Sequence, residues 1–261
     1  MPTGFAEDLA LLQEAAREAG AIALGYFGKD QQVWLKGGTS PVSEADYAAD
    51  SFLRKTLLAA RPDYGWLSEE TADDPARLAA RRTFVVDPID GTRGFLQGGD
   101  AWCVSVAVVE AGRTLAGVLE CPVRRETYSA VPGGGAFRNG DLIGVRQPGS
   151  MLDVAGPKAM LDQLPPPWQG RLHRAPYIPS LAFRLAMVAS GDLDATFVKP
   201  DAHDWDIAAA ELILAEAGGR LLDRQGRVPA FAGEVIRHGA LAAGSGELLG
   251  VMAAVISAPG G

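Results

Sequence analysis

A run of apolar residues that leads into two aspartates constrains this chain more than any other feature. Residues 84–95 read FVVDPIDGTRGF, and the β-branched valines in the run predict a buried strand. Because Pro88 has no amide proton to donate to a sheet, the strand is expected to end there. Asp87 and Asp90 would then lie close together at the carboxyl end of the strand.

The two aspartates indicate a cation site. Neighbouring carboxylates repel each other unless a positive group lies between them, and hard oxygen ligands select Mg²⁺, Mn²⁺ or Ca²⁺. Gly91 and Thr92 follow at the expected start of a helix, where free N–H groups favour an anion such as phosphate. The same residues also fit a strand followed by an Asx turn with both aspartates solvated. The rest of the chain decides between these interpretations.

Composition and charge exclude several classes of protein. Of the 261 residues, 48% are hydrophobic and 21% are charged, so we expect one large domain or two closely packed lobes rather than a disordered chain. The net charge of −8 argues against a nucleic-acid polymer or a membrane surface as a partner. The acidic N-terminus has no signal-peptide pattern, and no run reaches the roughly 18 apolar residues of a membrane span. The expected location is the cytoplasm.

The two cysteines, Cys103 and Cys121, lie in apolar segments that are typical of strands. We expect buried free thiols there rather than a disulfide. No spacing of cysteine and histidine typical of a metal site is present, so the expectation of a metal depends on the carboxylates.

Helical periodicity marks four long segments. Apolar residues recur at helical spacing over 5–27 and 180–190, and again over 203–217, where a Gly-Gly pair ends the pattern. A further helix is expected to begin after Ser43, with Asp46 at its third position in a variant of the capping box. The capping role accounts for Asp46 without any catalytic function.

Strands are expected between and after these helices. The valine-rich ones in the middle of the chain, with glycine turns at close spacing, predict an antiparallel meander. Loops are expected at 37–41 and 133–140, and the prolines at 165–167 indicate a surface excursion. The expected strands are residues 33–36, 65–70, 102–110, 115–120, 126–131, 195–198, 220–224 and 240–243.

Several segments together resemble the inositol monophosphatase superfamily of metal-dependent, lithium-sensitive phosphatases. They follow the family's order: 40–46 (SPVSEAD), 67–71 (LSEET), 87–92 (DPIDGT) and 205–210 (WDIAAA), with EAGG behind at 216–219. The resemblance implies an α/β fold, a layered α/β/α/β/α sandwich. It also implies one phosphatase domain over 1–261, with an N-terminal lobe at 1–148 and a C-terminal lobe at 149–261.

The resemblance implies a site with two or three Mg²⁺ ions, with Mn²⁺ as an alternative. Glu69, Asp87 and the carbonyl of Ile89 would hold the first ion. Asp87, Asp90 and Asp206 would hold the second, and a third, weaker one would lie beside Glu69. Two ions about 3.5–4 Å apart can activate a water molecule and neutralise the leaving oxygen of a phosphate ester.

Further roles follow from the same resemblance. The backbone N–H groups of Gly91 and Thr92 would bind phosphate. Thr92 and Asp46, together with Glu69, would act on the attacking water, which gives Asp46 a function beyond capping. Lys36 would approach the site from its loop.

Departures from the inositol phosphatases bear on the substrate. Arg93, after the DGT motif, resembles the 3'(2'),5'-bisphosphate nucleotidase and histidinol-phosphatase branches. Lys199 stands where similar inositol phosphatases have Glu, and Arg184 matches a position that is often Lys in the nucleotidases. A cationic side chain suits a substrate with a second phosphate or a carboxylate. Lys199 and Arg184 could equally be solvated charges on the surface. Ser180 is a further expected substrate contact, preceded by Pro179 where the family usually has Gly.

These features favour a bisphosphate nucleotidase that acts on 3'-phosphoadenosine 5'-phosphate. Inositol monophosphate, histidinol phosphate and fructose 1,6-bisphosphate follow as alternative substrates. A regulatory protein without catalysis is a rival, but such proteins usually lack a metal ligand, and the expected ligands are all present. The expected partner is thus a small phosphorylated metabolite. Because the family is often dimeric, a homodimer stays an open alternative.

Overall fold

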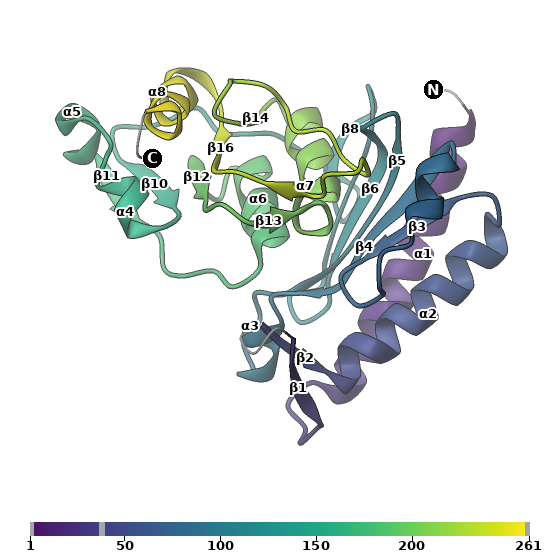
Figure 1. The fold of residues 1–261 in the computed structure, drawn as a ribbon. Helices are drawn as coiled ribbons and strands as arrows, with labels where there is room; N and C mark the ends of the chain where they lie inside the picture. Colours follow the sequence, from purple (N-terminus) through teal and green to yellow (C-terminus); the bar gives the residue numbers. More distant parts are fainter. Residues whose placement is uncertain (1–2, 37–39, 259–261) are drawn as a thin grey trace.

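Two β-sheets and three layers of helices alternate through the molecule (Figure 1). The computed structural model describes residues 3–36 and 40–258, and the statements below refer to these residues. The layers form the α/β/α/β/α sandwich expected from the sequence. Both sheets carry apolar side chains on their two faces, so each sheet needs helices on both sides.

The larger sheet has seven strands and follows the order β3-β4-β5-β6-β7-β8-β9. Only the β3–β4 pair is parallel, and the rest forms the expected antiparallel meander. The strands are β3 (Gly65–Ser68), β4 (Arg82–Asp90), β5 (Cys103–Glu110), β6 (Arg113–Cys121), β7 (Glu126–Val131), β8 (Gly135–Arg138) and β9 (Asp141–Ile143).

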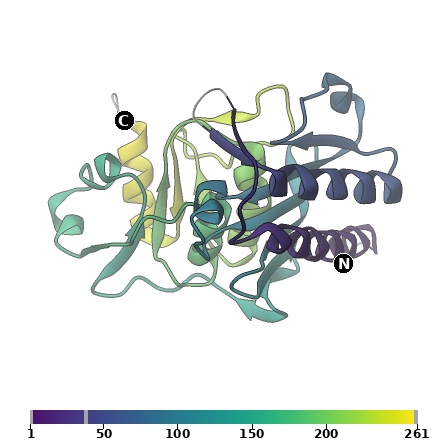
Figure 2. The same cartoon turned by 90° about the horizontal axis from the view of Figure 1, so that it is seen from below.

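Helices α1 (Thr3–Tyr26) and α2 (Glu44–Ala60) cover one face of this sheet and lie side by side (Figure 2). Alternation along β5 explains how both faces are buried. Val104, Val106 and Val108 pack toward α1 and α2, whereas the residues between them pack toward the opposite face. There lie α6 (Leu181–Ala189) and α7 (Asp204–Glu216), which form the middle layer.

The second sheet has five strands in the order β11-β10-β12-β16-β14. Its inner face packs on the middle layer, and its outer face is covered by α8 (Gly246–Ser257) with the short helices α4 (Lys158–Leu161) and α5 (Pro166–Gln169). The strands are β10 (Leu152–Ala155), β11 (Leu172–Arg174), β12 (Ala195–Val198), β14 (Arg220–Leu222) and β16 (Leu241–Gly244).

Small elements complete the fold. Two further antiparallel pairs of short strands are β1 (Val33–Lys36) with β2 (Ser40–Ser43), and β13 (Ala202–His203) with β15 (Arg237–His238). A 3₁₀ turn, η1 (Pro75–Ala79), precedes β4, and the short α3 (Thr92–Leu96) follows it. No helix of the described chain is long and apolar enough to cross a bilayer.

Three expectations on local structure were wrong. The strand expected to end at Pro88 continues as β4 to Asp90, because a register shift between Asp87 and Asp90 removes the proline from regular pairing. The segment 133–140, expected to be one turn, contains β8, flanked by tight turns. Of the expected loop at 37–41, residues 40–41 belong to β2, and residues 37–39 lie outside the described residues.

Other expectations are confirmed. Both cysteines are free and buried. The helix after Ser43 begins with Asp46 at its third position, and α3 begins directly after Gly91. The seven-stranded sheet is built from residues 65–143 and the five-stranded sheet from 152–244. The division into two lobes at residue 148 stays a prediction.

Glu211 on α7 gives a testable consequence of the packing. Its side chain is buried in the middle layer, and burial raises its pKa to about 7 from 4.5. The folded state therefore binds a proton that the unfolded state releases, and stability falls as pH rises from about 4.5 to 7. Glu211→Gln should increase the free energy of unfolding at pH 8 by on the order of 1–3 kcal/mol, with a smaller gain at pH 5.

Urea unfolding of both proteins at the two pH values would measure this difference. The exposed Glu18 supplies the control, since Glu18→Gln should change stability by no more than about 0.5 kcal/mol at either pH. A gain from Glu211→Gln that is equal at pH 5 and pH 8 would exclude titration of this carboxyl as the cause.

Candidate active site

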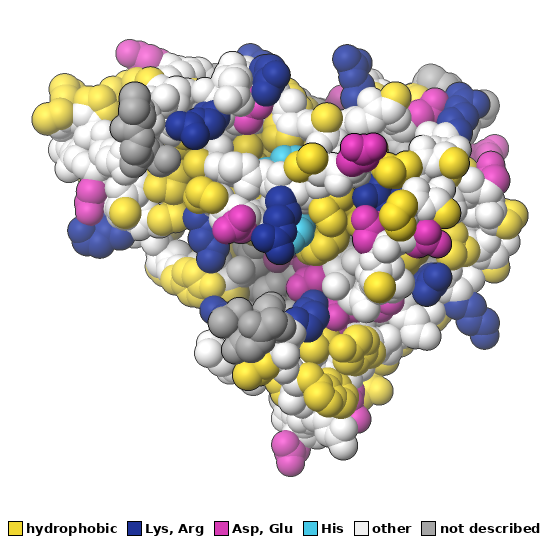
Figure 3. Space-filling model, viewed as in Figure 1, with side chains coloured by type: hydrophobic (Ala, Val, Ile, Leu, Met, Phe, Trp, Pro, Cys, Tyr) yellow, Lys and Arg dark blue, Asp and Glu magenta, His cyan; other side chains and the backbone are white. Residues whose placement is uncertain are grey.

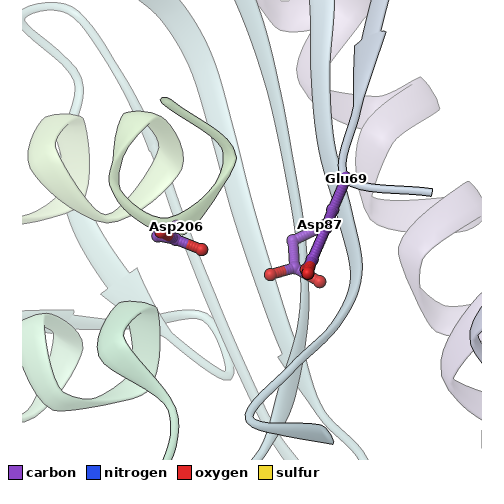
Figure 4. A group of neighbouring side chains, drawn as sticks. All are labelled: Glu69, Asp87 and Asp206. Carbon is purple, nitrogen blue, oxygen red and sulfur yellow. The ribbon is translucent and has the colours of Figure 1, made fainter. Parts of the chain in front are cut away.

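Three carboxylates meet where the larger sheet faces the start of α7. Parallel pairing of β3 with β4 sets Ser68 opposite Val86, so the next residues, Glu69 and Asp87, emerge at the same edge. Asp206, in the first turn of α7, points toward them (Figure 4). One oxygen from each of Glu69, Asp87 and Asp206 lies within 4.8 Å of the other two. Residues 137 positions apart thus form one cluster.

The irregular end of β4 directs the carboxylates. The backbone N–H of Ile89 donates to Asp87 Oδ1 at 3.0 Å, an Asx-type bond made across Pro88. Ladder pairing resumes only where Asp90 faces Cys103. The bulge therefore separates Asp87 from Asp90 and turns the Ile89 carbonyl toward the Thr92 hydroxyl, which donates to it at 3.1 Å.

Asp90 lies beside the three-carboxylate cluster rather than in it. Its Oδ2 accepts hydrogen bonds from Ser180 Oγ at 2.5 Å and from the backbone N–H of Ala182 at 2.6 Å. Asp90 still borders the same cavity of about 160 Å³ as Glu69, Asp87 and Asp206. The start of α6 therefore fixes the Asp90 carboxylate through its Oδ2.

The electrostatics of the cluster are unfavourable without a cation. Burial, followed by repulsion from Glu69 and Asp90, raises the pKa of Asp87 well above its usual range. Burial and then repulsion from Asp90 do the same for Asp206. The pKa of Asp90 is raised to about 6 by burial, against the hydrogen bonds from α6.

These residues fit a divalent metal ion. The donors are carboxylate oxygens, the ligand type that Mg²⁺ and Mn²⁺ prefer, and they converge on one small polar cavity. The repulsion that raises the pKa values of Asp87 and Asp206 is the repulsion that a cation between them would remove. Glu69, Asp87 and Asp206 would supply its ligands, with Asp90 and the Ile89 carbonyl alongside.

A second polar chain leads from α2 to the same cavity. Asp46 Oδ2 accepts from the backbone N–H and the hydroxyl of Ser43, at 2.8 and 2.6 Å, which fixes the first turn of α2. Its other oxygen, Oδ1, lies 3.1 Å from Thr92 Oγ1, whose single proton is shared between this oxygen and the Ile89 carbonyl. Burial raises the pKa of Asp46 to about 6, although the bonds from Ser43 and Thr92 lower it. Asp46 thus serves as a cap and also reaches the site.

Gly91 can be only glycine at this turn. It has a φ of +96°, and a Cβ there would lie 3.1 Å from the Ala101 carbonyl oxygen and from Ser180. The close fit brings the start of α3 against the start of α6. The start of α3 borders the small cavity through Gly91 and Thr92, and the Gly91 carbonyl accepts from the N–H groups of Gly94 and Phe95 in its first turn.

Lys36 reaches the site from β1. Its Nζ donates to Glu69 Oε1 at 2.9 Å and to Glu70 Oε1 at 2.7 Å. Burial lowers the pKa of Lys36, but the two glutamates outweigh it, so the ammonium group stays charged. The side chain of Glu70 is only 1% exposed, and burial raises its pKa to about 7 although the hydrogen bond from Lys36 lowers it.

A larger cavity of about 780 Å³ adjoins the cluster, and Asp90 and Asp206 border both spaces. Arg184 and Lys199 both line this cavity, and their contact with substrate stays a prediction. Arg184 Nε is buried without a hydrogen-bond partner among the described residues. Figure 3 shows acidic side chains inside a hollow of this face, with basic side chains around it.

Ser180 has a different environment from the one expected of a substrate contact. It is fully buried, donates to Asp90, and accepts from the backbone N–H of Phe183 at 3.0 Å as the N-cap of α6. Its hydroxyl therefore orients Asp90. A direct contact of Ser180 with substrate stays a prediction.

Comparisons with known proteins agree with this geometry. The model of the inositol monophosphatase family matches residues 6–258. The inositol-1-monophosphatase of Rhizobium meliloti is 32% identical, with 96% of each chain covered, and the histidinol-phosphatase of Chlorobaculum parvum is 33% identical, with 87% and 90% covered.

Solved structures give the same result. The extragenic suppressor protein suhB of Bartonella henselae has a TM-score of 0.84 and 28% identity, covering 96% of this chain and 98% of its own. The Thermotoga maritima IMPase has a TM-score of 0.82 and 26% identity, covering 95% of both chains. Together with the family match, they show that this chain belongs to the inositol monophosphatase family, a family of phosphoric monoester hydrolases.

Proposed function

We propose that this chain hydrolyses a small phosphate monoester by attack of water, with Mg²⁺ bound by Glu69, Asp87 and Asp206. The observation that carries the proposal is the convergence of these three carboxylates beside the Asp46–Thr92 hydrogen bond. Mn²⁺ is the alternative ion. When bound, such an ion supplies a Lewis acid that lowers the pKa of water and neutralises charge on the ester oxygens.

The chain's own residues hold and orient the reactants. The hydroxyl of Thr92 can accept a proton from water while it donates its own to Asp46, so the pair fixes the direction of attack. The N–H groups of Gly91 and Thr92, at the start of α3, would bind the phosphate oxygens. Asp90, fixed by Ser180 and Ala182, offers its remaining oxygen to the metal site.

For the substrate we propose a monoester whose leaving group carries a second anionic group, with 3'-phosphoadenosine 5'-phosphate favoured. Arg184 and Lys199 border the larger cavity next to the carboxylates. A buried guanidinium with an unpartnered Nε gains more from an anion than from a neutral polyol. Inositol 1-phosphate and histidinol phosphate are alternative substrates, because similar proteins are named inositol-1-monophosphatase and histidinol-phosphatase.

A matched substrate pair tests the proposal. In the presence of Mg²⁺, phosphate release should be faster from 3'-phosphoadenosine 5'-phosphate than from adenosine 3'-phosphate, which lacks only the second phosphate. We expect a preference of about 10- to 100-fold in kcat/KM, since a charge-assisted hydrogen bond contributes roughly 1.5–3 kcal/mol. Inositol 1-phosphate and histidinol phosphate complete the panel, and excess EDTA should stop every reaction.

Arg184→Met tests the residue and keeps much of its volume. The variant should lose most of the preference for the bisphosphate through an increase in KM, whereas Arg184→Lys should retain part of it. An equal loss on both adenosine substrates would instead assign Arg184 a structural role. Activity that survives EDTA would contradict the metal mechanism itself.

A further inference from the structure

Tyr177 is the most exposed of the large hydrophobic side chains that the structure describes, with 79% of its surface accessible. It lies in the segment between β11 and α6, at the mouth of the site. Its side chain borders the small cavity that holds the carboxylates, the larger cavity with Arg184, and a third space along the end of α3. Tyr177 therefore lies where the three spaces meet.

The backbone around Tyr177 is held in place on both sides. Pro176 and Pro179 restrict the chain, and Ile178 packs into the core between α6 and the larger sheet. Pro179 lies so close to α3 that a Cβ on Gly94 would come within 2.6 Å of its ring. The next residue, Ser180, is bonded to Asp90. The exposed ring is therefore presented from a fixed segment, which lowers the entropy lost when it binds a ligand.

Arg184 and Tyr177 line the same larger cavity. The larger cavity therefore combines an aromatic face with a guanidinium, while its inner end is formed by the acidic residues Asp90 and Asp206. A polyol could use the guanidinium only through neutral hydroxyl groups and would leave the aromatic face in water. A flat ring would cover that face.

We infer that Tyr177 is a specificity residue that stacks on a planar aromatic ring in the leaving group of the substrate. The inference rests on the proposed phosphatase function and narrows its substrate class. The ring belongs either to a purine nucleotide or to an imidazole such as that of histidinol phosphate. Both rings would stack on Tyr177 in the same way. The test distinguishes them because it uses one substrate with a purine and one with an imidazole.

The test compares Tyr177→Ala and Tyr177→Phe with the unchanged enzyme in the presence of Mg²⁺. The ring-bearing substrates are 3'-phosphoadenosine 5'-phosphate and histidinol phosphate, and the ring-free ones are inositol 1-phosphate and glycerol 2-phosphate. For the preferred ring-bearing substrate, Tyr177→Ala should raise KM about tenfold, the effect of losing one stacked base. Ring-free substrates should change by less than twofold, and Tyr177→Phe should behave as wild type on all four.

Leu142→Ala, which truncates an exposed side chain on β9, is the matched control and should change no kinetic constant. An equal loss on ring-bearing and ring-free substrates, or no loss on any, would overturn the role of Tyr177 while the phosphatase function stands. If the unchanged enzyme releases phosphate from none of the four, the proposed function fails, and the inference fails with it.

Discussion

Replacement of Asp87 by asparagine should reduce kcat/KM by roughly a thousandfold or more, because it removes the charge at the centre of the proposed metal site. Asp87 is the buried member of the three-carboxylate cluster, and its pKa is raised first by burial and then by its acidic neighbours. Asparagine keeps the shape and can still accept the hydrogen bond from the Ile89 N–H. The loss should therefore reflect charge rather than misfolding.

The same variant should be more stable than the wild type when no metal is present. A carboxyl whose pKa is raised on folding costs stability above its unfolded pKa, and this cost grows as pH rises toward the folded value. At pH 8 in EDTA, Asp87→Asn should therefore unfold at a higher temperature than the wild type. Added Mg²⁺ should raise the melting temperature of the wild type by mass action and leave that of the variant nearly unchanged.

Three measurements make this prediction sharp: phosphate release, melting temperature in EDTA, and the Mg²⁺-induced shift. Asp141→Asn, at an exposed aspartate on β9, should alter none of them. A variant that loses activity yet keeps the full Mg²⁺ shift would mean that the ion binds elsewhere. A variant that is less stable in EDTA would show that Asp87 is not under repulsion in the folded protein.

Periodicity in the sequence placed two acids of this site on their secondary-structure elements. Val85 and Val86 placed Asp87 at a sheet edge, and helical spacing put Asp206 in the first turn of a helix. What periodicity could not supply was the distance between these elements, since their approach depends on how α7 packs on the sheet. The resemblance to a known family supplied that step.

Local signals failed where tertiary contacts override them. Proline usually ends a strand because it has no N–H to donate. β4 nevertheless continues past Pro88, because the bulge between Asp87 and Asp90 means that no ladder hydrogen bond is needed from this residue. The glycines at 133–135 indicated a turn, but Gly135 begins β8 and its N–H donates to Glu216 on α7, 81 residues away. Helix α8 was not predicted from the sequence, because its strongly apolar residues show no clear polar face at helical spacing.

Tyr177 had no signal of its own in the sequence. It lies between two prolines in a segment without periodicity, and its importance comes from what surrounds it: Gly94, whose lack of a side chain admits Pro179, and Arg184 across the cavity. Substrate specificity is in general carried by such loop residues on a fixed scaffold. It is therefore the part of the function least visible to pattern analysis.

Replacement of Thr92 by valine should lower kcat by about 10²- to 10³-fold with little change in KM, since a positioned proton acceptor contributes on this scale. The hydroxyl has a single proton and two acceptor oxygens beside it, Asp46 Oδ1 and the Ile89 carbonyl, both at 3.1 Å. The proton serves one of these acceptors at a time, and a lone pair of the hydroxyl oxygen remains to accept a hydrogen bond from water. Valine keeps the shape of the side chain but removes this acceptor.

The surrounding contacts keep the fold of this variant intact. Asp46 retains both bonds from Ser43 on its other oxygen, so the start of α2 does not depend on Thr92. The backbone N–H of residue 92 also remains for phosphate, which is why KM should change little. The expected loss of stability is about 1 kcal/mol, the cost of one buried hydrogen bond.

Thr92→Ser is the matched control, because it restores the hydroxyl and omits only a methyl group. Its kcat should lie within about tenfold of the wild type, and single-turnover phosphate release would show whether the chemical step itself has changed. If Thr92→Val kept its rate, the hydroxyl would serve only to tie α3 to α2, and Asp46 would return to its capping role. If Thr92→Val is slow and Thr92→Ser is active, the result would support a role for Thr92 and Asp46 in orienting the attacking water.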